Sequence, residues 1–165
     1  MIAIVHLTPD FAVAGQLQPE DFAELATLGF RAVINNRPDG EEECQLGDRL
    51  AAVHAWRAGL QYRSIPAGKL DLFTDPVVAA TVQALAELEG PVLAYCKSGL
   101  RSTIVWAAAS ARSRPVDAVL ADLAGAGQEL EFLRDELDAQ ADRERWMTAD
   151  PVAGAIDEEQ SRAAA

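Results

Sequence analysis

Residues that build metal centres and disulfide frameworks are scarce in this sequence. Its 165 residues include two cysteines, Cys44 and Cys96, and two histidines, His6 and His54. Two cysteines are too few for a disulfide scaffold, and two histidines that lie far apart along the chain form no metal-ligand cluster. We therefore predict a protein without a metal or another cofactor, in which each cysteine is a free thiol.

Long apolar runs are also missing, and basic residues are outnumbered. No apolar stretch approaches the roughly 20 residues that cross a bilayer, and the start, MIAIVHLTPD, lacks the basic region of a secretory signal. The 14 Lys and Arg stand against 26 Asp and Glu, which gives a formal net charge of −12. Because so acidic a surface repels nucleic acid and anionic lipid, we predict neither as a partner, and a cytoplasmic location. A small anionic substrate is still allowed, since salt screens the field of distant charges within about a Debye length.

Short β-rich segments alternate with helical ones, which is typical of an α/β fold with a largely parallel sheet. The pattern predicts strands at 2–7, 30–35, 60–65 and 91–96, and helices at 19–29, 47–59, 75–90, 101–111 and 116–127. The helix at 47–59 carries Leu50, Val53 and Trp56 broadly on one face. The helix at 101–111 is apolar on nearly every face, so we expect it to be central and buried.

The length suits one domain, and the composition changes towards the C-terminus. We predict a catalytic domain over residues 1–128 and a charged helix over 129–148 that docks by a thin stripe of Leu130, Leu133 and Leu137. Residues 149–165 have no periodicity and are predicted to be disordered.

The segment CKSGLRS, at residues 96–102, carries most of the functional information. It lies between a predicted strand, PVLAYC, and the predicted buried helix. A cysteine that ends a strand and faces a helix N-terminus lies at the positive end of the helix dipole, which favours the reactive thiolate. We therefore predict that Cys96 is a catalytic nucleophile. The alternative is an inert buried thiol, with Arg101 as an ordinary surface residue.

The residues after this cysteine supply groups that bind an anion. Gly99 allows the backbone to curl, so that successive N–H groups form an anion nest. Arg101 offers a planar fork that grips an oxyanion with two parallel hydrogen bonds, and Ser102 can cap the helix or donate to the sulfur. The predicted catalytic residues are Cys96, Arg101 and Ser102, and the predicted substrate-binding residues of the loop are Lys97, Ser98, Gly99 and Leu100.

The CKSGLRS segment resembles the active loop Cys-x-x-Gly-x-Arg-Ser of rhodanese-type sulfurtransferases. A longer stretch, from Leu7 to about Gly127, resembles the bacterial beta-lactamase-hydrolase-like phosphatase domain family, in the blocks GQLQPEDFAELATLGFRAVINNRPDGEE, YRSIPAG and GPVLAYCKSGLRSTIVWA. That resemblance implies a cysteine-phosphatase-like three-layer sandwich with a four- to five-stranded, mostly parallel sheet flanked by helices. Some relatives resemble this chain fused to a persulfide-oxidising metallo-β-lactamase-like domain, which implies functional pairing with such an enzyme.

Two chemistries fit the loop, and its length favours one of them. Cysteine phosphatases carry five residues between Cys and Arg and usually His before the Cys, whereas four residues separate Cys96 from Arg101 and Tyr95 precedes the cysteine. A shorter loop encloses a smaller site, and sulfur transfer needs no general acid because the leaving thiolate or sulfite is a stable anion. We therefore favour a sulfurtransferase that forms a persulfide on Cys96, with thiosulfate or glutathione persulfide as the donor. The alternatives are a protein-tyrosine or dual-specificity-like phosphatase that hydrolyses a phosphoester, and a non-catalytic module that senses redox state or binds small anions.

Four further residues are considered for the site. Asp71 and Asp75 are the general-acid candidates of a phosphatase, although Asp75 also suits the simpler role of a helix N-cap. Arg37 follows a predicted strand, and loops at the carboxyl ends of parallel strands gather around one site. It either binds an anionic substrate or braces the acidic residues of its own loop. We expect Cys44 to be an ordinary thiol that can pair with Cys96 only if their loops meet.

Overall fold

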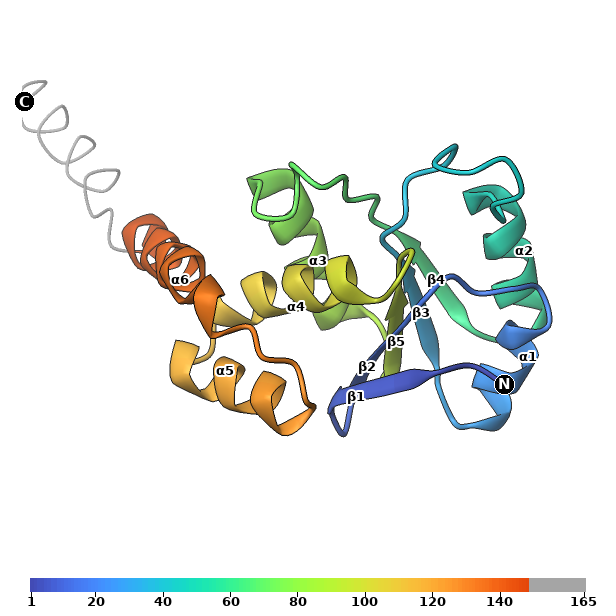
Figure 1. Cartoon of the computed structure of the whole chain (residues 1–165), viewed down its shortest axis with the longest axis horizontal. Coiled ribbons are helices and arrows are strands. Elements are labelled where there is room, and N and C mark those ends of the chain that lie inside the picture. Colours follow the sequence, from blue (N-terminus) through green and yellow to red (C-terminus); the bar gives the residue numbers. More distant parts are fainter. Residues whose placement is uncertain (149–165) are drawn as a thin grey trace, which may run out of the picture.

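The computed structural model describes residues 1–148, which form a five-stranded sheet between two layers of helices (Figure 1). The strands are β1 (Ile4–Thr8), β2 (Phe11–Ala14), β3 (Ala32–Asn35), β4 (Gln61–Ser64) and β5 (Val92–Tyr95). The α-helices are α1 (Asp21–Thr27), α2 (Asp48–Arg57), α3 (Asp75–Glu87), α4 (Leu100–Ala111), α5 (Val116–Gly125) and α6 (Arg134–Thr148), with a 3-10 helix at Glu131–Leu133. This arrangement confirms the predicted α/β sandwich with a mostly parallel sheet.

The sheet has the strand order β1-β2-β5-β3-β4, which places β5 at its centre. Strands β2, β5, β3 and β4 run parallel to their neighbours, whereas β1 pairs with β2 in the antiparallel direction. The sequence pattern does not predict β2. Its four residues are all buried, and so short a run without alternation has no period that distinguishes a strand from a loop.

Side chains of the central strand alternate between two hydrophobic layers. Val92 and Ala94 face the layer that contains α3, α4, α5 and α6, whereas Leu93 and Tyr95 face α1 and α2. A strand covered by helices on both faces needs apolar residues at every position, which is why PVLAYC reads as a continuous apolar run. The strand is therefore fixed from both sides up to its last residue, Tyr95.

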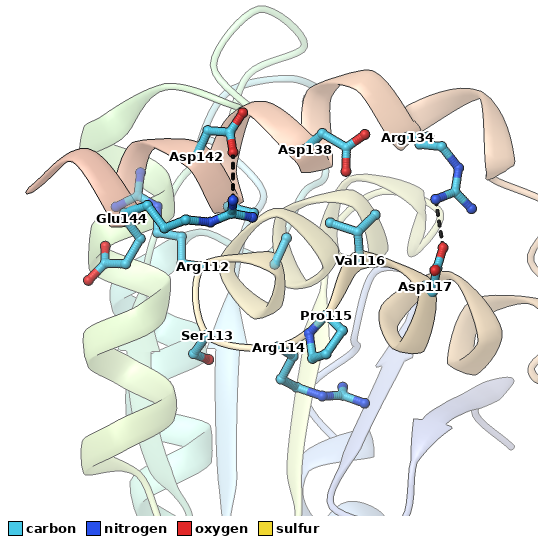
Figure 2. A pocket seen from close by; sticks show the side chains of 13 residues that line it. Arg112, Ser113, Arg114, Pro115, Val116, Asp117, Arg134, Asp138, Asp142 and Glu144 are labelled. Carbon is cyan, nitrogen blue, oxygen red and sulfur yellow. Dashed lines mark hydrogen bonds and ion pairs between the residues drawn. The ribbon is translucent and has the colours of Figure 1, made fainter. Parts of the chain in front are cut away.

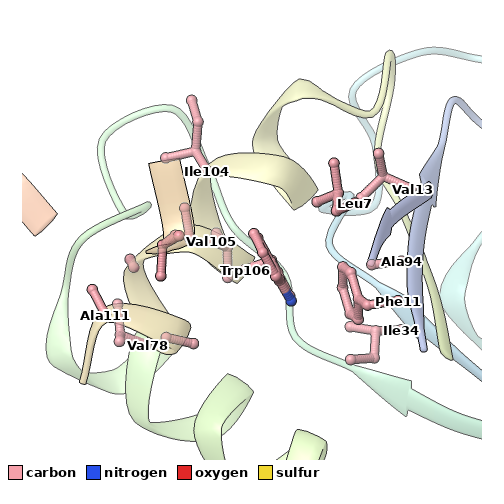
Figure 3. Packing of buried hydrophobic residues seen from close by; sticks show 14 of the residues in the cluster. Leu7, Phe11, Val13, Ile34, Val78, Ala94, Ile104, Val105, Trp106 and Ala111 are labelled. Atoms are coloured by element: carbon pink, nitrogen blue, oxygen red, sulfur yellow. The ribbon is translucent and has the colours of Figure 1, made fainter. Parts of the chain in front are cut away.

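Helix α4 is the centre of the thicker layer. Residues 102–111 of this helix are all buried, as we predict from its apolar surface, and α3, α5 and α6 pack around it. Trp106 is 4% exposed and stacks on Phe11 with ring centroids 5.7 Å apart (Figure 3). The guanidinium of Arg114 lies 6.0 Å from the Trp106 ring. The loop that precedes α4 is thus attached to the most deeply buried helix of the described chain.

Helix α2 turns its large apolar residues towards solvent. Leu50, Val53 and Trp56 are all exposed, and the helix packs through Ala51 and Ala55 instead. Alanines contribute little to a hydrophobic pattern. The sequence therefore indicates the larger apolar residues as the packing face of this helix, and that prediction is wrong. Single exposed apolar residues are common on protein surfaces and need no partner.

The charged C-terminal helix α6 packs against α4 and α5. Leu130, Leu133 and Leu137, the stripe that we predict for docking, are buried in the same core cluster as α4. The domain boundary at residue 128 stays a prediction, and the predicted tail at 149–165 lies outside the described residues. Within residues 1–148, no helix combines the length and the apolarity needed to cross a membrane.

Candidate active site

The candidate nucleophile follows directly after the central strand. Strand β5 ends at Tyr95, and α4 begins at Leu100, so Cys96 lies in a four-residue loop between the carboxyl end of the sheet and a helix N-terminus. In an open parallel sheet this edge is where ligands bind. The structure thus places Cys96 where the strand-loop-helix pattern predicts it.

The loop curls around the sulfur because of one glycine. Gly99 has φ +92°, a conformation that other residues adopt at a cost, and its N–H donates to Cys96 Sγ at 3.2 Å. A Cβ at Gly99 would lie 3.3 Å from the carbonyl oxygen of Ala14 in β2. The loop is also tied to the end of β2 by the Gln16 N–H, which donates to the Lys97 carbonyl at 3.2 Å. Any side chain at Gly99 would therefore disturb the contact between the loop and the sheet.

The other loop residues differ in accessibility. Cys96 and Ser102 are buried, whereas Lys97, Ser98 and Leu100 are exposed. The Ser102 hydroxyl is buried without a hydrogen-bond partner, so it forms neither of the two bonds that we predict for it, to the helix end or to the sulfur. Gly99, and not Ser102, is the N-cap residue of α4.

Arg101 extends from the first turn of α4 to two other segments. Its Nη1 and Nη2 donate to the two carboxylate oxygens of Glu41, each at 2.8 Å, and Nη1 also donates to the Ala67 carbonyl at 2.8 Å. The pKa of Arg101 is raised, chiefly by these hydrogen bonds to Glu41 and further by the charge of the nearby Cys96 sulfur. Arg101 is therefore positioned beside the nucleophile, but a carboxylate of the chain itself occupies its fork.

Arg37 joins the same cluster from the carboxyl end of β3. Its side chain is 2% exposed, Nε lies 2.9 Å from Glu41 Oε2, and Nη1 donates to Gln16 Oε1 at 2.8 Å. Burial acts to lower the pKa of Arg37, but the bonds to Glu41 and Glu42 outweigh it and the net shift is upward. Of the two roles that we consider for Arg37, the structure shows the bracing of its own acidic loop. It also brings Arg37 and Arg101 to one carboxylate.

Glu41 and Glu42 are site residues that the sequence analysis does not single out. Glu41 is shared by the two arginines, and Glu42 pairs with Lys97 and lies 3.1 Å from Arg37 Nη2. The available signal was the run EEE directly after NNRPDG, which we interpret only as a possible partner of Arg37. Its contact with Arg101, sixty positions further along the chain, depends on the path of two loops and leaves no local pattern.

The two general-acid candidates lie in different places. Asp71 is exposed, accepts a hydrogen bond from the Gly68 N–H at 3.2 Å, and belongs to the loop whose Ala67 contacts Arg101. Asp75 pairs with Arg112, at the far end of α4 from Cys96. It is the first residue of α3 and forms no side-chain cap, so its predicted cap role is wrong. Of the two, Asp71 is the one near the loop.

The second cysteine lies on the acidic loop that contacts the site. Cys44 is exposed and Cys96 buried, and both are free thiols. Cys44 is two positions from Glu42, which pairs with Lys97 of the nucleophile loop. The loops of the two cysteines therefore meet, as a pairing of these cysteines requires.

A cavity of about 710 Å³ lies at the other end of α4, between the start of α5 and α6 (Figure 2). Since α4 has twelve residues, this cavity is about 18 Å along the helix from the nucleophile loop. Its lining mixes arginines with acidic residues, such as the Arg134–Asp117 pair at 2.7 Å. The residues that line it include no cysteine or histidine, so it offers no counterpart to Cys96.

Comparison with known proteins gives a family and a set of similar structures. The family model described as the phosphatase-like domain of beta-lactamase hydrolase-like protein matches residues 3–113, more than half of the chain. The beta-lactamase hydrolase-like protein of Xylella fastidiosa (strain Temecula1) is 38% identical over 104 residues, which make up 63% of this chain and 24% of that protein. The chain thus matches about a quarter of the length of this relative.

Solved structures agree with this family. A candidate phosphatase from Neisseria meningitidis is 32% identical, has a TM-score of 0.71, and aligns over 85% of this chain and 99% of its own. TpbA of P. aeruginosa, solved in complex with phosphotyrosine, is 17% identical with a TM-score of 0.56, over 86% of this chain and 90% of its own. At that identity TpbA shows the shared fold alone.

These comparisons contradict the predicted sulfurtransferase and favour its phosphatase alternative. The prediction relied on the four-residue spacing between Cys96 and Arg101. In the structure Arg101 extends from the first turn of α4 and Arg37 comes from the loop after β3, so the length of the nucleophile loop alone does not set the size of the anion site. Thiosulfate and glutathione persulfide as donors, and pairing with a persulfide-oxidising enzyme, lose their basis with the sulfurtransferase.

Proposed function

The chain belongs to the family of beta-lactamase hydrolase-like phosphatase domains, and on that premise we propose that it is a cysteine-dependent phosphatase of phosphomonoesters. The observation that carries this proposal is the hydrogen bond from the Gly99 N–H to Cys96 Sγ at 3.2 Å. A backbone amide aimed at the sulfur stabilises a thiolate, and a loop of such amides at a helix N-terminus is suited to phosphate.

In the proposed reaction the Cys96 thiolate attacks phosphorus. An S–P bond forms as the bond between phosphorus and the leaving oxygen breaks, and the leaving oxygen takes a proton. Water then attacks the phosphocysteine and gives a proton back to the group that protonated the leaving oxygen, the S–P bond breaks, and inorganic phosphate leaves while the thiolate is restored. The N–H groups of residues 97–102 and the Arg101 guanidinium stabilise the charge that develops on the phosphoryl oxygens.

Asp71 is the proposed donor of the proton to the leaving oxygen. It lies on an exposed turn after Ala67, whose carbonyl contacts Arg101. A general acid matters most when the leaving group is a poor one. In Asp71→Asn we therefore expect a larger loss of rate with phenyl phosphate than with p-nitrophenyl phosphate. An equal loss with both substrates would assign the proton to another group.

Phosphotyrosine is the first substrate to test. One solved neighbour, TpbA of P. aeruginosa, holds phosphotyrosine, and an aryl phosphate reaches a deep nucleophile more easily than a short alkyl phosphate. Within the proposal, Arg37 and Arg101 bind the phosphate and Ser98 and Leu100 contribute through their backbone. Ser102 acts as a donor to the thiolate once its hydroxyl rotates.

The experiment that tests the proposal is hydrolysis of p-nitrophenyl phosphate by the wild type, Cys96→Ser and Cys44→Ser. We expect Cys96→Ser to lose activity by at least about a thousandfold, and Cys44→Ser, which changes the other thiol, to retain it. Orthovanadate, which mimics the transferred phosphoryl group, should inhibit the wild type. Full activity in folded Cys96→Ser would show that Cys96 is not the nucleophile.

A further inference from the structure

Residues 39–46, which we call the acidic flap, lie against the cations beside the nucleophile. The base of the flap is closed by its own hydrogen bonds: Gln45 Nε2 donates to the Pro38 carbonyl at 2.8 Å, and the Asp48 N–H donates to Asp39 Oδ1 at 2.9 Å. The middle of the flap has no helix or strand. Its contacts with the nucleophile loop and α4 are ion pairs of Glu41 and Glu42.

The Glu41 carboxylate lies between two guanidinium groups. Both of its oxygens accept from Arg101 at 2.8 Å, and Oε2 also accepts from Arg37 Nε at 2.9 Å. The bonds from Arg101 lower the pKa of Glu41 to about 2, with burial opposing and Arg37 adding to the effect. Glu41 is thus a charged anion held by two-pronged contacts of the kind that Arg makes with a phosphate.

Glu42 holds a second, adjacent position. It pairs with Lys97 of the nucleophile loop, and Glu42 Oε2 lies 3.1 Å from Arg37 Nη2. Arg37 Nη2 is buried without a well-aligned hydrogen bond, so this contact is an ion pair that a better-placed anion can improve. Two carboxylates of one flap therefore face three cations from two separate parts of the chain, Arg37 on one and Lys97 and Arg101 on the other.

A substrate cannot use this site while the flap is closed. Cys96 is completely buried, and both Nη atoms of Arg101 already donate to Glu41. If the flap leaves, Arg37 with its side chain 2% exposed loses two anions at once. A poorly solvated guanidinium without an anion is costly, so a ligand that supplies negative charge to Arg37 as well as to Arg101 competes best with the flap.

We propose that Glu41 and Glu42 are an internal substrate mimic, and that the substrate which displaces them is a phosphomonoester with a second anionic group next to the phosphate. This inference rests on the proposed phosphatase function. The phosphate takes the place of Glu41 between Arg101 and Arg37, and the second anion takes the place of Glu42 between Arg37 and Lys97.

The first test measures binding of inorganic phosphate by NMR titration to the wild type, Glu41→Gln, Glu42→Gln and Glu43→Gln. Glu43 is the matched control, because it lies on the flap and takes part in none of the ion pairs described for residues 1–148. We expect Glu41→Gln to tighten phosphate binding by about tenfold, since the competing internal anion is gone. Glu42→Gln should tighten it less, and Glu43→Gln by no more than about twofold, as expected for a screened surface charge.

Two outcomes would overturn the mimic. Weaker phosphate binding in Glu41→Gln would mean that the carboxylate orients Arg101 for the substrate and does not compete with it. Equal tightening in Glu43→Gln would mean that a general loss of negative charge explains the effect. If Glu41→Gln does not fold, phosphate binding by Glu42→Gln tests the proposal in its place.

The second test uses Cys96→Ser, which binds substrates without turning them over. Phosphotyrosine peptides with Asp or Asn directly after the phosphotyrosine form one matched pair, and a sugar bisphosphate and its monophosphate form another. We expect the doubly anionic member of at least one pair to bind about tenfold more tightly, and Arg37→Met to remove that preference. The pair that shows the preference identifies the source of the second anion, and no preference in either pair would overturn this part of the proposal. Because both tests measure binding, absence of hydrolysis by the wild type would count against the phosphatase alone.

Discussion

The molecule has two regions that are held together by different forces. The first, the dry body, consists of α3, α4, α5 and α6 with the sheet face they cover; its interior is an apolar cluster, although ion pairs such as that of Asp75 with Arg112 also join its helices. The second, the charged mouth, consists of Arg37, Glu41, Glu42, Lys97 and Arg101 at the carboxyl end of the sheet. The nucleophile loop connects them. Apolar burial makes the dry body the main source of stability, whereas the ion pairs of the mouth reach solvent and can exchange partners.

The largest loss of stability should follow a change in the dry body. Trp106→Ala removes a ring that is 4% exposed and stacks on Phe11, and we expect it to lower the free energy of unfolding by about 3–5 kcal/mol. Trp56→Ala is the matched control, since Trp56 is 78% exposed, and it should cost no more than about 0.5 kcal/mol. Urea denaturation measures both, and similar losses in the two variants would contradict the division into two regions.

A change in the charged mouth should cost less. Arg37→Met leaves Gln16 without its donor and Glu41 with Arg101 alone, and we expect a loss of about 1–3 kcal/mol. The loss is smaller than for a fully buried pair because Glu41 and Glu42 reach solvent. Arg31→Met removes the exposed pair with Glu89 and should be nearly neutral. Urea denaturation of both variants checks this. A larger loss of unfolding free energy in Arg37→Met than in Trp106→Ala would mean that the charged mouth contributes more to stability than the dry body.

Acid should weaken the mouth before it affects the body. The pKa of Glu41 is lowered in the folded protein, mainly by Arg101, from about 4.5 to about 2. A lowered pKa means that the unfolded state binds protons first, so this stabilisation is complete above about pH 4.5 and is lost as the pH falls towards 2. The free energy of unfolding, measured by urea denaturation at a series of pH values, should therefore fall less steeply with decreasing pH in Glu41→Gln than in the wild type across this range. Identical slopes would show that Glu41 is not held by the arginines in solution.

The smallest change in stability is expected for Tyr95, whose polar hydroxyl lies in an apolar layer. Tyr95 is fully buried beside α1 and α2, and its hydroxyl forms no well-aligned hydrogen bond, although the Tyr62 hydroxyl lies near enough to affect the pKa of Tyr95. Tyr95→Phe removes that unsatisfied group, so the free energy of unfolding should stay the same or rise by about 1 kcal/mol. Thermal unfolding gives the comparison. A clear loss of stability would reveal a partner for the hydroxyl.

The sequence predicts the dry body better than the charged mouth, for a physical reason. Uninterrupted apolar segments indicate α4 and β5 correctly, because an element that is covered on every face needs apolar residues at nearly every position. The same logic fails for β2, which is too short to show a period, and for α2, where small alanines make the contact. In these cases the packing leaves no trace in the hydrophobic pattern.

For the candidate site, the sequence predicts the nucleophile loop but not the acidic residues that contact it. The order of Cys96, Gly99 and Arg101 predicts the curl of the loop, since glycine conformation and helix dipole are local effects. The bond between Glu41 and Arg101 joins residues sixty positions apart, and opposite charges in a sequence do not indicate which of them meet. The spacing of Cys96 and Arg101 was also a poor guide to the reaction, because Arg37 joins the same cluster from the loop after β3.

The close approach of Gly99 to Ala14 decides which part of the site can move. The nucleophile loop rests on β2 so closely that a Cβ at Gly99 would lie 3.3 Å from the Ala14 carbonyl oxygen, so the loop has little room to shift towards the sheet. For the proposed phosphatase this leaves residues 39–46 as the part that moves on substrate entry, while Cys96 Sγ and the Gly99 N–H keep their arrangement. In the proposed phosphatase, access to Cys96 then requires that the ion pairs of Glu41 and Glu42 are exchanged for contacts with the substrate.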